Sequence, residues 1–311
     1  MFIRSLPFSS ADPISPRLAP LVSRLTVRFE AGARAELAPD GQRLTLGIPV
    51  LGTQAEEVFE GGGDLRFGCE LESLKDGLEE ATRRAYSRVL QRAGAAALCR
   101  IWNYVPEINA TPGGETLENY RAFSRARAQA FETAWGVDFT RRLPAASAVG
   151  GPLETLAVVF ATSNAEPNSV ENPEQMPAYR YPQEHGPRSP SFSRGSQVKG
   201  KQAEWVFLSG TAAIKGHRTV APGELDPQIS CTLDNLRLVS IACGVGDDLG
   251  AATGWRRQFK VYLRQARDWE AARQRLETGL LRPGDEVVWL QADICRADLE
   301  VEIEASLVRP R

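Results

Sequence analysis

Histidine and paired cysteine, the residues most often found in zinc sites and catalytic triads, are nearly absent from this sequence. Only two histidines occur in 311 residues, His185 and His217, and their separation matches no familiar ligand spacing. The five cysteines are scattered, and no two of them form a CxxC pair. We therefore expect no metal site and no Ser-His-Asp triad, and we expect reduced thiols, as in a cytoplasmic protein.

A strong charge of one sign and a long apolar run are also missing. The formal net charge is -2, which gives no reason to expect nucleic acid or an anionic membrane as a partner. No apolar run approaches the roughly 20 residues that a membrane-spanning helix needs. Residues 1–7 (MFIRSLP) lack the apolar core of a signal peptide, and residues 1–22 are rich in proline and serine. These features favour a cytoplasmic globular protein with an irregular N-terminal arm.

Strand and helix patterns alternate along the rest of the chain. Alternating apolar residues and short apolar runs predict strands over 24–30, 43–50, 96–104, 153–161, 204–212, 259–263, 286–293 and 299–308. Apolar residues at steps of three and four predict helices over 71–93, 117–135, 229–243 and 269–279. The last part of this order is partly repeated in the middle, and the first 60 residues look like a copy that holds only strands. We therefore expect an α+β fold of three units, 1–66, 67–185 and 186–311.

The last predicted strand carries an unusual run of acids. Because side chains alternate along a strand, four carboxylates share one of its faces: Asp298, Glu300, Glu302 and Glu304. One interpretation is a solvated face opposite basic side chains of another strand, for which the candidates are Arg256, Arg257, Lys260 and Arg264. The other is that one carboxylate is buried in a cleft, keeps its proton and acts as a general acid.

Residues 164–200 are polar and rich in proline, and they allow two interpretations. A disordered linker has this composition. A long ordered loop that lines a site has it too, and such a loop also uses aromatic residues. Tyr179, Tyr181 and Phe192, with Arg188 between them, favour the ordered loop.

Several segments occur together in the order found in one known family. They are residues 100–109 (RIWNYVPEIN), 118–123 (ENYRAF), 171–173 (ENP), 177–182 (PAYRYP), 186–192 (GPRSPSF) and 289–305 (WLQADICRADLEVEIEA). In these segments the chain resembles the chorismatases, or chorismate hydrolases, and its last unit resembles the RidA/YjgF fold. The resemblance covers most of the chain from about residue 98 onward, and the first 60 residues contribute nothing to it.

The resemblance implies a fold and a reaction. Chorismatases cleave the enolpyruvyl ether of chorismate, release pyruvate and use no metal or organic cofactor. Their RidA-like units form a pseudo-threefold arrangement within one chain, with mixed sheets backed by helices and a site between the central and C-terminal units. A glutamate of the closing strand protonates the terminal methylene of the enol ether. Because the units already bury each other's faces, we expect a monomer.

By this resemblance Glu302 is the acid, and Glu300 and Glu304 on the same face remain alternatives. Protonating an enol ether carbon gives an oxocarbenium ion, which requires an acid whose pKa is raised toward neutrality, as burial does. Chorismate is a dicarboxylate, so bidentate cations are needed, and Arg180 and Arg188 are the candidates. The other candidate substrate-binding residues are Tyr179, Tyr181, Tyr104, Tyr120, Arg121, Gly210 and Thr211.

The resemblance also bears on the product. In chorismatases a cysteine at the position of Cys295 accompanies a hydroxybenzoate product, and its replacement accompanies a dihydroxycyclohexadiene carboxylate. We therefore expect 3-hydroxybenzoate, alone or mixed with 4-hydroxybenzoate, although a lone cysteine in a strand is more often an inert buried thiol. The alternatives are a diene-forming chorismatase, a RidA-like imine or enamine deaminase, and a module that binds a metabolite without catalysis.

Overall fold

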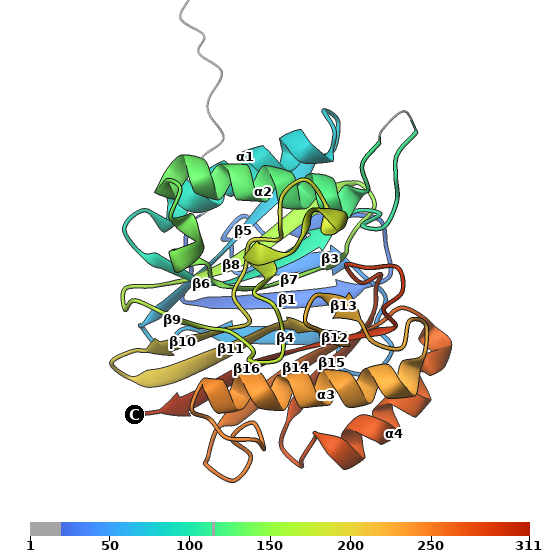
Figure 1. The fold of residues 1–311 in the computed structure, drawn as a ribbon. Helices are drawn as coiled ribbons and strands as arrows, with labels where there is room; N and C mark the ends of the chain where they lie inside the picture. Colours follow the sequence, from blue (N-terminus) through green and yellow to red (C-terminus); the bar gives the residue numbers. More distant parts are fainter. Residues whose placement is uncertain (1–19, 114–115) are drawn as a thin grey trace, which may run out of the picture.

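The computed structural model describes residues 20–113 and 116–311. The arm expected over residues 1–22, including the segment without signal-peptide character, therefore lies almost wholly outside the described residues. Strands of the described ranges form three larger sheets and one two-stranded ribbon, and two pairs of helices lie at opposite ends of the view (Figure 1). In these ranges the helices are too short or too polar to cross a membrane.

The first sheet is built from the N-terminal strands. It has the order β2-β3-β1-β4 and consists of β1 (Arg24–Glu30), β2 (Ala35–Leu37), β3 (Arg43–Gly47) and β4 (Glu56–Glu60). Strand β1 runs parallel to β3 and antiparallel to β4. Its alternating pattern buries Leu25, Val27 and Phe29 and leaves the residues between them more exposed, as a sheet with one packed face requires.

The second sheet carries the helices at the top of Figure 1. It has the order β5-β8-β6-β7 and consists of β5 (Leu65–Ser73), β6 (Ala97–Val105), β7 (Ala145–Gly150) and β8 (Thr155–Ser163). The helices α1 (Leu78–Ala93) and α2 (Asn119–Trp135) bury their apolar sides against one face of this sheet. Tyr86 of α1 and Phe131 of α2 meet there edge to face, with ring centroids 5.3 Å apart.

The third sheet contains the strand with the acidic run. It has the order β15-β14-β16-β11-β10-β9 and consists of β9 (Asn168–Val170), β10 (Gly195–Lys199), β11 (Ala203–Thr211), β14 (Arg256–Leu263), β15 (Glu286–Gln291) and β16 (Val301–Pro310). The helices α3 (Leu225–Ala242) and α4 (Trp269–Gly279) lie below it in Figure 1. A ribbon of β12 (Ile214–Lys215) and β13 (Arg218–Thr219) follows β11.

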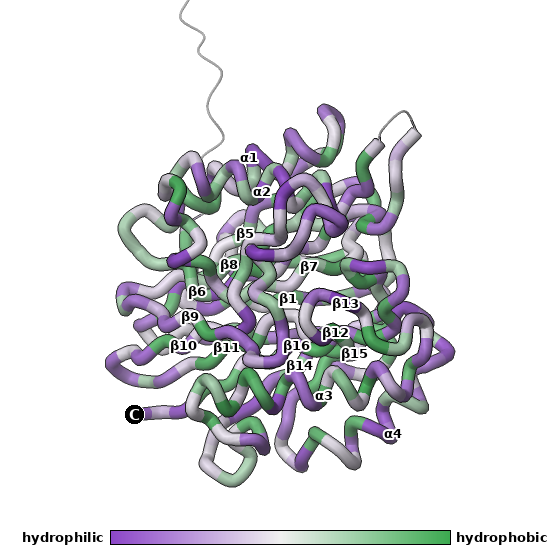
Figure 2. Tube along the Cα trace, in the orientation of Figure 1, coloured by the Kyte–Doolittle hydropathy of each residue, from purple (hydrophilic) through white to green (hydrophobic). Residues whose placement is uncertain are grey.

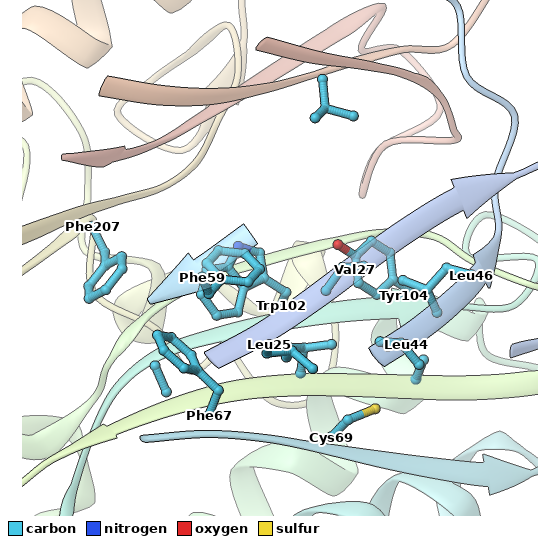
Figure 3. Close-up of a cluster of buried hydrophobic side chains, with 14 of the residues drawn as sticks. Leu25, Val27, Leu44, Leu46, Phe59, Phe67, Cys69, Trp102, Tyr104 and Phe207 are labelled. Carbon is cyan, nitrogen blue, oxygen red and sulfur yellow. The ribbon is translucent and has the colours of Figure 1, made fainter. Parts of the chain in front are cut away.

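All three sheets turn one face toward a common core. Figure 3 shows side chains of this core meeting from the first sheet (Leu25, Phe59), the second (Phe67, Trp102) and the third (Phe207). The strands of the second and third sheets are therefore covered on both faces, by helices on one side and by this core on the other. Figure 2 shows the complementary pattern, with hydrophilic residues recurring along the outer helices.

The structure confirms most predicted elements and corrects several. The helix predicted over 71–93 begins at Leu78, because β5 continues to Ser73 and Gly77 breaks the chain at a φ of 83°. The short strands β7, β9 and β10 were not predicted. Residues 164–200 are ordered, which confirms the loop interpretation and rules out a linker. The α+β fold is confirmed, whereas the three unit boundaries and their threefold arrangement stay predictions.

Candidate active site

A cavity of about 490 Å³ lies between the second and third sheets. Its wall combines the start of α2, the ordered loop before β10, the end of β11, the ribbon β12–β13 and the segment that leads into β16. The residues that line it include Tyr120, Arg121, Tyr181, His185, Phe192, Arg194, Gly210, Arg218, Cys295, Arg296 and Glu302. This volume is in the range of small-molecule sites, and its polar groups converge from segments far apart in the sequence.

Glu302 lies on β16 at the wall of this cavity and is only 3% exposed. Both faces of β16 are covered, so the interpretation of the acidic run as a solvated face is wrong for Glu302 and Glu304. Burial, and then the charge of Glu304, raise the pKa of Glu302 to about 8 from its ordinary value of 4.5. Within the described ranges Oε1 of Glu302 has no hydrogen-bond partner. The carboxyl group of Glu302 is therefore neutral near pH 7 and is not tied to another described residue through Oε1.

Gly210 provides the space that the carboxyl group of Glu302 occupies. A Cβ atom at this position would lie 2.7 Å from Cδ of Glu302 and 2.9 Å from Cβ of Ser147, so any side chain here would force the carboxyl group of Glu302 to move. The pairing of β11 with β16 shifts register between Leu208 and Thr211, so a bulge lies beside the acid. Bulges of this kind often re-aim side chains next to active sites.

Glu304, two residues further along β16, has a different environment. Its carboxylate receives Nζ of Lys260 at 2.9 Å, a guanidinium nitrogen of Arg100 at 2.6 Å and Nε1 of Trp102 at 2.8 Å. Burial opposes ionisation, but Lys260 and Arg100 together hold the pKa of Glu304 below its usual value. Glu304 is therefore a bound carboxylate. Its negative charge contributes to the raised pKa of Glu302.

The network around Glu304 joins the sheets. Lys260 of β14 also contacts Glu57 of β4 at 2.8 Å and donates to the hydroxyl of Tyr104 at 3.3 Å. Of the four basic residues expected to face the acidic run, only Lys260 is seen to pair with it. Arg257 binds Asp285 instead, and Arg264 binds Asp293 and nearby carbonyl groups.

A buried arginine that the sequence did not single out lines the cavity. Arg194 is 4% exposed and donates to the hydroxyl of Tyr181 at 2.7 Å. Its guanidinium lies over the ring of Phe192, 5.1 Å from the centroid, and its Nε has no partner among the residues that the structure describes. A buried, charged donor without a partner, on a residue that lines a cavity, is suited to bind an anion. In the sequence, Arg194 could have been found from its position two residues after the segment GPRSPSF, which ends in Phe192.

Four of the predicted substrate-binding residues line the cavity: Tyr120, Arg121, Tyr181 and Gly210. Cys295 also lines it, and burial followed by the charge of Glu302 raises the pKa of its thiol to about 12. Cys295 is therefore a neutral thiol at physiological pH. All five cysteines are free, as expected.

The structure does not bring the other predicted residues into this cavity. Arg180 is exposed beside Tyr179, and Arg188 pairs with Glu132 of α2 at 2.9 Å. Tyr104 is buried in the common core, on the opposite face of the second sheet, and Thr211 donates to the carbonyl of Ser209 at 2.7 Å. We therefore look to Arg194 and Arg296, and not to Arg180 and Arg188, for the cations of the site.

The two histidines, which the spacing argument set aside, lie together. Nε2 of His185 is 3.0 Å from Nδ1 of His217, and His185 lines the cavity mouth. The two residues are 32 positions apart, and they meet because the ordered loop and the ribbon β12–β13 fold toward each other. The spacing of the histidines in the sequence could not predict this contact.

Comparisons with known proteins agree with this architecture. A protein-family model described as "Chorismatase FkbO/Hyg5-like, N-terminal" matches residues 49–162. The chain is 36% identical to a 3-hydroxybenzoate synthase of Streptomyces hygroscopicus over 236 residues, which cover 72% of this chain and 68% of the relative. It is also 35% identical to a chorismatase of the same organism over 232 residues, covering 72% and 66% of the two chains.

A solved structure extends the match to nearly the whole fold. The crystal structure of a chorismatase superposes with a TM-score of 0.76 at 26% identity, over 96% of each chain. The sequence relatives and the fold therefore agree, and this chain belongs to the chorismatase family.

Proposed function

We propose that this chain cleaves chorismate to pyruvate and a hydroxybenzoate, with Glu302 as the general acid. Membership of the chorismatase family supports the reaction, and one relative is a 3-hydroxybenzoate synthase. The observation that carries the assignment of the acid is the carboxyl group of Glu302. It is buried at the cavity wall, held neutral near pH 7, and has an oxygen without a partner.

The chemistry begins with protonation of carbon. Glu302 gives its proton to the terminal methylene of the enolpyruvyl group, and the carbon that bears the ether oxygen becomes an oxocarbenium ion. The carboxylate left on Glu302 lies beside this cation and stabilises it. The bond between the ether oxygen and the ring carbon then breaks, so that this oxygen leaves as the keto oxygen of pyruvate. The ring, which keeps its own hydroxyl oxygen, loses one proton as it becomes aromatic, and this proton balances the one that Glu302 gave. General acid catalysis of this kind contributes about 10²- to 10⁴-fold in rate.

Glu304 is excluded as the acid by its partners, and Glu300 by its position. Three donors bind Glu304, and the positive charges of Lys260 and Arg100 keep it ionised despite burial. Glu300 is partly exposed and does not line the cavity. We therefore assign Glu304 a positioning role, in which its charge holds the pKa of Glu302 high.

The two carboxylates of chorismate need cations. Arg194 and Arg296 flank Tyr181 in the cavity, and their guanidinium carbons lie 5.8 and 5.5 Å from its ring centroid. We propose that the free Nε of Arg194 binds one carboxylate. Arg296, which also donates to Thr219 at 3.2 Å, binds the other.

Cys295 supports a hydroxybenzoate product. Its neutral thiol lies at the cavity wall, close enough to Glu302 for that carboxylate's charge to raise its pKa. We propose that Cys295 shapes the ring side of the site, so that the product is aromatic and chiefly 3-hydroxybenzoate.

Two further properties belong to this proposal. We propose a monomer, because the inner faces of all three sheets already pack together within one chain. Light scattering of the purified protein checks this, and a stable trimer would contradict it. We also propose a cytoplasmic location, which the five free cysteines support.

The test is to mix the purified protein with chorismate and follow pyruvate release while the ring products are separated by chromatography. We expect pyruvate with 3-hydroxybenzoate. The Glu302→Gln variant should bind chorismate and release no pyruvate, whereas Glu300→Gln, the matched control just before the same strand, should keep its activity. Turnover that survives Glu302→Gln would overturn the assignment of the acid, and a diene acid as product would overturn the role of Cys295.

A further inference from the structure

A triangle of ligand atoms lies at the cavity mouth and has no part in the proposed reaction. Oε1 of Glu184 is 3.4 Å from Nε2 of His185 and 3.2 Å from Nδ1 of His217, and the two nitrogens are 3.0 Å apart. We propose that Glu184, His185 and His217 bind one divalent transition-metal ion of the zinc class.

Hydrogen bonds satisfy this triangle poorly while the carboxylate of Glu184 is ionised. The carboxylate oxygen of Glu184 is an acceptor, and each ring nitrogen is either a donor or an acceptor. If both nitrogens of His185 and His217 carry protons, two donors face each other at 3.0 Å. If only one does, the other nitrogen faces the carboxylate as acceptor against acceptor at 3.2 or 3.4 Å. With an ionised carboxylate, each placement of protons therefore sets two groups of like polarity side by side, and a central cation removes this contact by accepting all three lone pairs.

The dimensions also suit a metal ion. Zinc binds imidazole nitrogen and carboxylate oxygen at about 2.0–2.2 Å with tetrahedral geometry, which places neighbouring ligand atoms about 3.3 Å apart. The three observed separations of 3.0, 3.2 and 3.4 Å surround this value. Two histidines and one carboxylate leave a fourth position for water or another ligand.

The surrounding residues hold the ligands in place but limit the affinity. Tyr181 packs against both imidazoles, with ring centroids 5.1 Å from His185 and 6.4 Å from His217. The side chains of the two histidines are 20% and 22% exposed, so an ion can enter from solvent. Arg121 and Arg296 line the same cavity and oppose a cation. We therefore expect a weaker site than a structural zinc site with four protein ligands.

An ion here would link two separate segments of the cavity wall. Glu184 and His185 belong to the short helix η3 (Gln183–His185) of the ordered loop, and His217 belongs to the turn between β12 and β13. Both segments border the mouth of the cavity. Metal binding is therefore expected to raise the free energy of unfolding with the logarithm of the free metal concentration, once this exceeds the dissociation constant.

The test uses full-length protein freed of metal by a chelator and dialysis. Titration calorimetry with Zn²⁺ should give one ion per chain, and Co²⁺ should give the intense visible absorption of a tetrahedral site. Because loss of an outer-shell partner alone costs about 10- to 100-fold in metal affinity, His217→Ala should weaken Zn²⁺ binding at least about 100-fold. Glu184→Gln, a change on an exposed side chain, should weaken it in the same direction without disturbing the fold.

The thiol of Cys295 in the same cavity could bind Zn²⁺ in place of the three proposed ligands. Cys295→Ser controls for this and should bind Zn²⁺ with the affinity of the parent. The proposal is overturned if the parent binds no stoichiometric Zn²⁺, if His217→Ala and Glu184→Gln bind it unchanged, or if binding is lost in Cys295→Ser. The unfolding midpoint should also rise with Zn²⁺ in the parent and stay constant in His217→Ala.

Discussion

The acid of the site should reduce the stability of the protein at neutral pH, and replacing it should recover that stability. Glu302 is protonated in the folded chain, where its pKa is about 8, and it ionises in the unfolded chain at its ordinary value of 4.5. The unfolded chain therefore releases a proton that the folded chain keeps. The contribution of Glu302 to stability is present below pH 4.5 and is lost as the pH rises through 8.

The size of the effect follows from the two pKa values. One pKa unit corresponds to about 1.4 kcal/mol, so between pH 5 and pH 8 the parent should lose about 3 kcal/mol of unfolding free energy through Glu302 alone. Glutamine has the same shape and does not titrate. The difference in unfolding free energy between Glu302→Gln and the parent should therefore change by about 3 kcal/mol in favour of the variant from pH 5 to pH 8. Any constant effect of the amide on stability is the same at both pH values and does not alter this change.

Urea unfolding at pH 5, 6, 7 and 8 measures this difference, because the free energy falls linearly with denaturant. Glu300→Gln is the control, since its side chain is partly exposed and lies outside the cavity. The reasoning is refuted if Glu302→Gln and the parent show parallel curves of stability against pH. It is also refuted if Glu300→Gln shows the same gain.

Four further outcomes concern catalysis. Because Glu302 must be protonated, kcat/KM for pyruvate release should fall about tenfold for each pH unit above about 8, and a flat profile would contradict its role as acid. Gly210→Ala should lower kcat about 10²-fold with the fold retained by circular dichroism, since the new methyl group displaces the carboxyl group. Arg194→Lys should lower kcat/KM about 10- to 100-fold, the worth of one charge-assisted hydrogen bond, and Arg188→Lys should change nothing. Chromatography of Cys295→Gly should show the product shifting from hydroxybenzoate toward the diene acid, and an unchanged ratio would leave the thiol without a role.

The sequence predicted the parts of the site that lie in regular elements with a distinctive local pattern. The run of four acids stood out because acids recur at every second position of an apolar strand, and the resemblance to the chorismatases assigned the acid within this run to Glu302. The choice between Glu302 and Glu304 needed the structure. Both are buried on the same strand, and only their partners, Lys260 and Arg100 from other elements, distinguish a neutral acid from a bound carboxylate.

The cations were harder to predict because they lie in a loop. The segment from Tyr179 to Phe192 was expected to line a site, and Tyr181 and Phe192 do. Composition could not show which arginine of the loop turns inward. Arg188 pairs with Glu132 on α2, whereas Arg194, just before β10, is fixed by the hydroxyl of Tyr181. Which arginine points into the cavity depends on contacts with residues far away in the sequence, and the local pattern of apolar residues does not reveal them.

The ion cluster around Lys260 has a consequence for synthesis of the chain. Glu57 enters it from β4, Arg100 from β6, Lys260 from β14 and Glu304 from β16, so its members are translated early, midway and last. These cations hold Glu304 ionised, and its charge then adds to the effect of burial on the pKa of Glu302. In a nascent chain, the pKa of Glu302 therefore cannot reach its final value until the first and last segments have come together. Activity should thus appear only when the whole fold is complete. A fragment that begins after the first sheet should be inactive, even though it contains every residue of the cavity wall.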